Sequence, residues 1–237
     1  MAYIPATVSK LKIQDQTPMS DNSWTDSQRF DSKAAAWDAN ATRSALAEAV
    51  ARAIIAHLPV MRPERALEFG CGTGMVTLRV ARHCGQITAI DTSREMLRML
   101  NEKIAADNVV NVAPLLLDLT QSDAVAHIEG TFDFVFSSMT LHHIPDTPTF
   151  LLQLNAHLSP GATLAIADLD AEDGLFHDDE TEKVHHGFGR DALRSMLETA
   201  GFENISFITA HIIEKRKRAG MLADYPVFLV TANKPRH

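Results

Sequence analysis

The stretch Ala66-Leu67-Glu68-Phe69-Gly70-Cys71-Gly72-Thr73-Gly74 joins an apolar run to a helical pattern that begins near Met75. Its three glycines stand at alternate positions between the two. Glycine has no Cβ and adopts positive φ easily, so a ligand can approach the main chain of such a loop closely. Amide N–H groups at the start of the helix can donate hydrogen bonds to that ligand. The stretch therefore predicts a strand, a ligand-binding loop and a helix, in this order.

Two carboxylates flank the glycines. Asp91 closes the next apolar run, about 20 residues after Gly70, where an acid can accept hydrogen bonds from ribose hydroxyls. Glu68 lies near the carboxyl end of the first run, two residues before Gly70, and its charge suits a ligand with an ammonium group but repels a pyrophosphate. A dinucleotide motif, G-x-G-x-x-G, would need glycine at position 75, but that residue is Met75. The pattern favours a nucleoside cofactor with an amino-acid end over a dinucleotide.

Apolar runs alternate with helix-like segments along the middle of the chain, which is typical of a parallel α/β sheet. The runs are Arg65–Phe69, 87–90, 109–117, 132–136 and 163–167. Two later runs, 205–213 and 227–232, have no helix between them, so we expect an antiparallel pair.

Helix signals complete the pattern. Residues 30–57 carry apolar side chains at three- and four-residue spacing, and Thr92 with Glu95 forms a capping box for the next helix. A further helix, 190–200, ends before Gly201. Residues 1–28 lack apolar periodicity and are predicted to be a flexible N-terminal arm. We expect residues 29–237 to form a single domain with N-terminal lid helices.

Composition narrows the function classes. The 237 residues include 30 acidic and 22 basic side chains, and the net charge of −8 argues against wholesale binding to nucleic acid or anionic lipid. Two cysteines, Cys71 and Cys84, give neither a disulfide framework nor a metal ligand set. Without a secretory or membrane-spanning pattern, we expect a cytoplasmic protein.

Taken together, these residues resemble the class I S-adenosylmethionine-dependent methyltransferases, in particular the small-molecule group similar to ubiquinone and menaquinone biosynthesis methyltransferases. Four blocks carry the resemblance, which covers roughly residues 30–234: 67–74, 90–97, 132–146 and 158–162. It implies an α/β fold with a doubly wound, mostly parallel, Rossmann-like sheet of seven strands. The implied order is 3-2-1-4-5-7-6 with strand 7 antiparallel. The implied cofactor is S-adenosyl-L-methionine.

The resemblance also implies the cofactor-binding residues, each at a position that matches a family motif. Glu68 would meet the methionine end, Asp91 the ribose, Asp118 the adenine amino group and Ser137 the region beneath the sulfonium. The segment from Phe30 to Asp38 resembles the lid helix of the group, whose aromatic residue covers the cofactor. The complete set is Trp37, Glu68, Gly70, Cys71, Gly72, Thr73, Gly74, Asp91, Thr92, Met96, Asp118, Leu119 and Ser137.

Methyl transfer from a sulfonium is an in-line displacement that depends on alignment in a dry cavity, and it needs a base only if the acceptor must lose a proton. Candidates follow the predicted strands at their carboxyl ends: His142, His143, Asp168, Asp170, His185 and His186. We favour His142 or His143 as base or orienting donor, although a histidine in this loop is at least as often a structural hydrogen-bonding residue. The acidic and histidine cluster in 177–186 lacks paired ligand spacing, so we predict no metal site.

The sequence thus predicts an S-adenosylmethionine-dependent methyltransferase that acts on a small-molecule acceptor, as a monomer or homodimer, without a nucleic-acid or membrane partner. One alternative is a methyltransferase acting on a macromolecule, although residues 137–140 lack the Asn/Asp-Pro-Pro-Tyr/Phe run of amino-methylating nucleic-acid enzymes. A nicotinamide oxidoreductase is disfavoured by Met75 and Glu68. A non-catalytic cofactor-binding protein stays open, because binding residues alone do not establish turnover.

Overall fold

The computed structural model describes residues 25–59, 61–118, 128, 130–179, 182–216 and 221–236. The strands are β1 (Arg65–Phe69), β2 (Gln86–Asp91), β3 (Val112–Leu116), β4 (Phe132–Ser138), β5 (Leu158–Leu169), β6 (Glu203–Arg216) and β7 (Leu222–Asn233). The α-helices are α1 (Thr25–Trp37), α2 (Ala41–Ala56), α3 (Thr77–Val80), α4 (Arg94–Ala106), α5 (Thr147–Ala156) and α6 (Arg190–Thr199). Two short 3₁₀ helices are η1 (Ala81–His83) and η3 (Leu141–His143).

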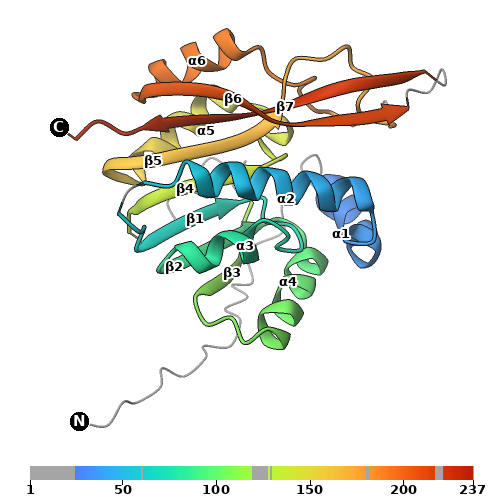
Figure 1. Cartoon of the computed structure of the whole chain (residues 1–237), viewed down its shortest axis with the longest axis horizontal. Helices are drawn as coiled ribbons and strands as arrows, with labels where there is room; N and C mark the ends of the chain where they lie inside the picture. The colour runs from blue at the N-terminus through green and yellow to red at the C-terminus, as the bar shows by residue number, and fades with distance from the viewer. Residues whose placement is uncertain are drawn as a thin grey trace.

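The strands of the described chain form one seven-stranded sheet in the order β3-β2-β1-β4-β5-β7-β6 (Figure 1). Strands β1 to β5 pair in parallel, whereas β7 runs antiparallel to both β5 and β6. This confirms the doubly wound α/β class, the antiparallel final pair and the strand order that the resemblance implied.

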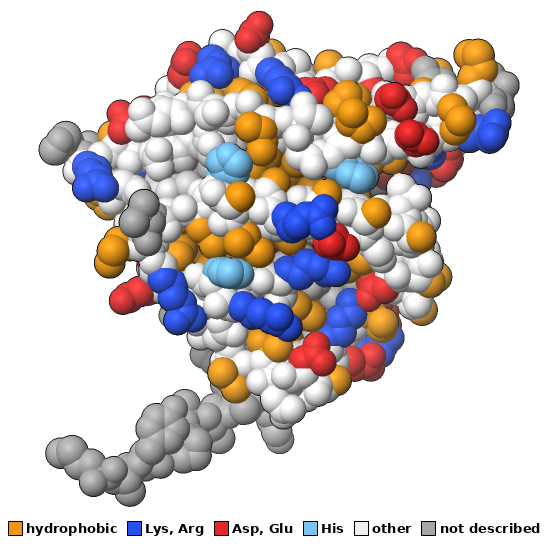
Figure 2. All heavy atoms as spheres, viewed as in Figure 1, with side chains coloured by type: hydrophobic (Ala, Val, Ile, Leu, Met, Phe, Trp, Pro, Cys, Tyr) orange, Lys and Arg blue, Asp and Glu red, His pale blue; other side chains and the backbone are white. Residues whose placement is uncertain are grey.

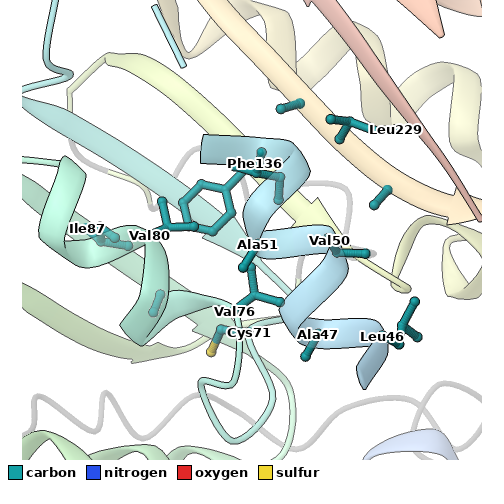
Figure 3. Close-up of a cluster of buried hydrophobic side chains, with 14 of the residues drawn as sticks. Leu46, Ala47, Val50, Ala51, Cys71, Val76, Val80, Ile87, Phe136 and Leu229 are labelled. Atoms are coloured by element: carbon teal, nitrogen blue, oxygen red, sulfur yellow. The ribbon is translucent and has the colours of Figure 1, made fainter. Parts of the chain in front are cut away.

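Helices cover both faces of the sheet, so its strands are apolar on both sides. Phe134 and Phe136 of β4 point to the face covered by α2, where Phe136 packs near Ala51 and Val76 (Figure 3). On the other face, Leu67 and Phe69 of β1 join the cluster formed with α5 and α6. Val135 of β4 belongs to this second cluster, so the side chains of one strand alternate between two cores, as strand geometry requires.

The helices follow the sequence prediction with three differences. The predicted helix 30–57 is interrupted at Asn40, whose side chain accepts a hydrogen bond from the Arg43 N–H and starts α2. The N-cap of α4 is Ser93 rather than Thr92, because the Ser93 hydroxyl accepts from the Met96 N–H at 3.1 Å. Helix α1 begins at Thr25, so the last four residues of the predicted arm are helical; residues 1–24 lie outside the described range.

The carboxyl ends of the parallel strands share one edge of the sheet, and α1 lies at that edge, on the side to which the β1 arrow points (Figure 1). Open α/β sheets bind ligands at this edge. Figure 2 shows Lys and Arg side chains grouped over the face that α2, α3 and α4 cover, although the whole chain is acidic. Among the described residues, no helix combines the length and the apolar character needed to cross a membrane.

Candidate functional site

The glycine loop follows β1 and has the backbone that its sequence predicts. Gly70, Gly72 and Gly74 have φ values of 67°, 54° and 81°, in the left-handed region. A Cβ on Gly70 would lie 2.0 Å from Thr140 Oγ1, and one on Gly74 would lie 2.3 Å from Leu100 Cδ1. A Cβ on Gly72 would meet nothing within 4 Å. Gly72 is therefore the point at which a ligand can approach the main chain.

Asp91 is fixed beside this opening at the end of β2. Its Oδ2 accepts from the Gly72 N–H at 2.7 Å, and its Oδ1 accepts from the Ser93 N–H at 2.9 Å. Burial raises the pKa of the carboxyl, and these hydrogen bonds oppose the rise because they favour the charged form. The carboxylate is half-buried and held in place, with lone pairs available to ribose hydroxyls.

Glu68 lies at the end of β1 with only 1% of its surface exposed. Its Oε2 atom has no hydrogen-bond partner, and burial raises the pKa of the carboxyl to about 8. A buried polar atom without a partner is unfavourable unless a ligand supplies the missing contact. Together with the opening at Gly72 and the fixed Asp91, this carboxyl group fits a nucleoside cofactor that ends in an amino acid.

The other predicted cofactor residues surround this core of the site in different ways. Thr73 and Cys71 are buried within the loop, and burial raises the pKa of the Cys71 thiol well above its usual range. Ser137 is buried, and its hydroxyl donates to the Phe69 carbonyl at 2.7 Å, so it ties β4 to β1. Met96 is buried at the start of α4. The rest are Trp37, Thr92 and Asp118, which are half-buried, and Leu119, which lies outside the described residues.

Helix α1 presents three distinct faces, since each helical residue turns by about 100°. Gln28, Ser32, Ala35 and Ala36 are exposed and form the solvent face. A second face contacts the glycine loop and α4, and we call it the cofactor face. Its residues are Ser27, Asp31 and Ala34 of α1, together with Asp38, which follows the helix directly. A third face points to the loops after β4 and β5; we call it the acceptor face, and its residues are Arg29, Phe30, Lys33 and Trp37.

The cofactor face is held by two acids of the predicted lid segment, whose contacts the sequence did not predict. Asp31 accepts from the Ser93 hydroxyl and, at 3.1 Å, from the Glu95 N–H, so it caps α4 from outside. Asp38 accepts from the Thr73 hydroxyl and pairs with Lys103. The available signal was their seven-residue separation, which places both acids on one side of a helix.

The acceptor face meets the loops that follow β4 and β5. The Phe30 ring lies 5.8 Å from Trp37 and 5.4 Å from His143, both edge-to-face. Arg29 forms an ion pair with Glu182 at 2.7 Å, and Glu182 also lies 3.1 Å from His177 Nδ1. Burial lowers the pKa of His177 to about 4, so its ring is neutral at pH 7. These contacts connect the predicted lid helix to the region in which the acceptor is expected.

The two favoured histidines occupy different environments. His142 is 2% exposed, and its Nδ1 donates to Asp168 Oδ1 at 2.7 Å while its main-chain N–H donates to Asp168 Oδ2 at 3.2 Å. Burial acts to raise the pKa of Asp168, but the charge and hydrogen bonds of His142 outweigh it and the pKa is lowered. His143 is half-buried between the rings of Phe30 and His142. His143 is thus the histidine that lies against the lid helix.

The remaining candidates serve other contacts. Arg190 Nε and Nη2 each donate to a carboxylate oxygen of Asp170 at 2.7 Å, so that acid anchors α6. His185 Nε2 lies 3.0 Å from the Ile144 carbonyl and supports the loop after η3, whereas His186 is exposed. Within the described residues, no group of three His, Cys, Asp or Glu side chains is arranged to hold a metal ion; residues 180 and 181 of the cluster lie outside them.

Comparisons with known proteins identify the family of the chain. The family model for a methyltransferase domain matches residues 39–207. An uncharacterized methyltransferase of Schizosaccharomyces pombe is 31% identical over 154 residues, which cover 60% of this chain and 54% of the relative. The trans-aconitate 2-methyltransferase of Deinococcus radiodurans is 33% identical over 120 residues, or 50% of this chain and 43% of that protein. The matches thus span about half the length of these curated relatives.

Solved structures share the fold at low sequence identity. The N-methyltransferase NodS of Bradyrhizobium japonicum, in complex with S-adenosylhomocysteine, has a TM-score of 0.66 and 17% identity over 91% of this chain and all of its own. The [4+2]-cyclase SpnF has a TM-score of 0.69 and 18% identity over 93% of this chain and 98% of its own. Because one neighbour is named for a cyclisation, the fold alone does not specify the reaction.

Proposed function

The chain belongs to the class I S-adenosylmethionine-dependent methyltransferases, and from this we propose that it transfers the methyl group to a small-molecule acceptor by in-line displacement. The observation that carries the proposal is the opening at Gly72, which lies beside the fixed Asp91 carboxylate and follows a strand that carries the buried Glu68 carboxyl with its unpartnered oxygen. The names of two relatives, a trans-aconitate and a ubiquinone biosynthesis methyltransferase, support a small acceptor.

The cofactor, when bound, supplies a methyl group on a positively charged sulfur. Asp91 would accept hydrogen bonds from the ribose hydroxyls while it keeps its bond from the Gly72 N–H. Glu68 would lose its proton to pair with the ammonium of the methionine end, because a buried ion pair favours the charged carboxylate. Helix α1 would exclude water from the transfer region, where alignment in a dry site accelerates the displacement.

His143 is the residue that we assign to the acceptor. It is half-buried and faces Phe30, whereas His142 is enclosed and held by Asp168. In this assignment His142 is a positioning residue, since it fixes the direction of η3 and so the place of the His143 ring. An acceptor that must lose a proton would pass it to the His143 imidazole.

The test combines calorimetry with a transfer assay. Asp91→Asn should weaken S-adenosylmethionine binding by about 1.5–3 kcal/mol, the range for hydrogen bonds to a charged group. Asp107→Asn removes an acid at the far end of α4 and should bind like wild type. Incubation of the enzyme and labelled S-adenosylmethionine with a metabolite extract should then give a labelled product of low molecular mass. Equal affinity of Asp91→Asn and wild type, or cofactor binding without any labelled small molecule, would contradict the proposal.

A further inference from the structure

Two cations near the acceptor face of α1 have no acidic partner among the described residues. Lys33 on α1 and Arg43 on α2 are both half-buried, and neither side chain forms an ion pair with a carboxylate in this part of the chain. Their neighbours differ, because Arg29 pairs with Glu182 and Lys103 pairs with Asp38. Acidic side chains are in excess in this protein, so two half-buried cations left unpaired at one place require a reason.

Both cations adjoin a row of rings that leads to His143. The Arg43 guanidinium lies 4.0 Å over the Trp37 ring, which is followed by Phe30 and then by His143 at the distances given above. Lys33 stands between Phe30 and Trp37 on the same face of α1, within about one helical turn of each. Arg43 therefore lies at one end of an aromatic row whose other end is His143, the proposed acceptor residue, and Lys33 lies beside that row.

The charges at this place repel one another. Burial lowers the pKa of Lys33, and the positive charges of Arg29 and Arg43 add to the effect, while Glu182 and Asp179 oppose it. Burial also lowers the pKa of Arg43. A bound anion would offset both the repulsion and the loss of hydration.

On the basis of the proposed function, we propose that the methyl acceptor carries an anionic group, a carboxylate or a phosphate, that Lys33 and Arg43 bind at the acceptor face of α1. The apolar part of the acceptor lies along Phe30 and Trp37, and its reacting atom lies toward His143. Lys33 and Arg43 are then specificity-determining residues that select charged acceptors over neutral ones of the same shape.

Binding is tested first, without turnover. A Trp24→Phe background leaves Trp37 as the single tryptophan of the chain, so its fluorescence reports on the proposed site. The probes are 4-hydroxybenzoate, 4-hydroxyphenyl phosphate and neutral 4-hydroxybenzamide. We expect saturable fluorescence changes with at least one of the two anions and none with the amide. Lys33→Met should weaken anion binding at least about tenfold, the effect of losing one hydrogen bond to a charged group.

Arg52→Gln is the matched control, since it removes one positive charge from an exposed position of α2 that pairs with Glu48. It should bind the anions like the background protein. Circular dichroism spectra and melting curves of the variants verify that each one is folded. Saturable binding that is equal in the background and in Lys33→Met, equal binding of acid and amide, or no saturable binding of either anion would each overturn the inference.

A second readout separates this inference from the proposed function. With labelled S-adenosylmethionine and the acceptor found in the extract screen, Lys33→Met should raise KM at least about tenfold with a smaller change in kcat. If the chain binds the cofactor and methylates only neutral acceptors, the inference is wrong and the proposed function stands. If calorimetry detects no cofactor binding, the proposed function fails first, whatever the anion titration gives.

Discussion

Glu68 makes the stability of the free protein depend on pH in a way that one substitution should remove. Its carboxyl is 1% exposed, its Oε2 has no partner, and burial raises its pKa from 4.5 to about 8. In the unfolded chain the group would lose its proton near the ordinary value. The perturbation is Glu68→Gln, which keeps the shape of the side chain and cannot ionise.

The sign and size follow from the two pKa values. The folded pKa lies above the unfolded one, so between about pH 4.5 and pH 8 the folded state retains a proton that the unfolded state has released. Stability from this group is therefore full below about pH 4.5 and falls as the pH rises toward 8. At 1.36 kcal/mol for each pKa unit, the loss between pH 5 and pH 8 is on the order of 4 kcal/mol.

The assay is urea unfolding followed by circular dichroism at several pH values from 5 to 8, without cofactor. The free energy of unfolding of wild type should fall relative to that of Glu68→Gln across this range by on the order of 4 kcal/mol. Glutamine buries an amide with its own penalty, but that penalty does not vary with pH, so the comparison uses slopes. Glu198→Gln, which removes an exposed carboxyl from α6, should keep the wild-type slope.

Cofactor binding should reverse the protonation of Glu68, because the ammonium of the methionine end stabilises the carboxylate. Calorimetry at pH 7 in buffers of different ionisation enthalpy should then show the release of most of one proton from wild type and less from Glu68→Gln. Parallel stability curves for wild type and Glu68→Gln, together with equal proton release, would refute the reasoning about this buried carboxyl.

Two further predictions concern the loop and the histidine pair. Gly72→Ala should fold, but the positive φ at this position should cost about 1–2 kcal/mol of unfolding free energy, which urea unfolding measures. The variant should bind S-adenosylmethionine poorly, because the new methyl group occupies the opening. Tight binding in calorimetry would contradict the assignment. Asp168→Asn should lower stability at pH 7 by about 1–3 kcal/mol. The folded pKa of Asp168 lies below 3.8, so its carboxylate contributes to the free energy of unfolding above that pH, and this contribution is lost as the pH falls through the folded pKa. The stability of Asp168→Asn should therefore fall less in acid than that of wild type.

The sequence predicted the parts of the fold and site that depend on local pattern. The apolar runs of β1 and β2 end at the glycine loop and at Asp91, and the structure places Asp91 beside that loop, where its Oδ2 accepts from the Gly72 N–H. The absence of a helix between the last two runs was enough to predict the antiparallel pair β6 and β7. Both inferences use the order of strands and helices along the chain. Because connections between strands follow fixed rules, this order determines where each strand lies in the sheet.

The parts that the sequence did not predict depend on tertiary contacts. Thr92 and Ser93 are both suitable caps, and the choice falls to Ser93, whose hydroxyl also donates to Asp31 of α1. The enclosure of His142 follows from Asp168, which lies 26 residues away and accepts from both its ring and its main chain. A single sequence shows neither the Ser93–Asp31 pairing nor the His142–Asp168 pairing, because the two residues of each pair lie far apart in the sequence and share no repeating pattern.

Helix α1 links the two halves of the site. Its cofactor face is held by Asp31 and Asp38 on the glycine loop and α4, and its acceptor face is held by Arg29 on Glu182. Because one helix carries both sets of contacts, we expect a shift of the loop beneath the cofactor face to move Phe30 and Lys33 at the acceptor face as well. If both proposals hold, α1 recognises the cofactor with one face and the acceptor with the other, and the acceptor side of the site is complete only while α1 is docked on the glycine loop.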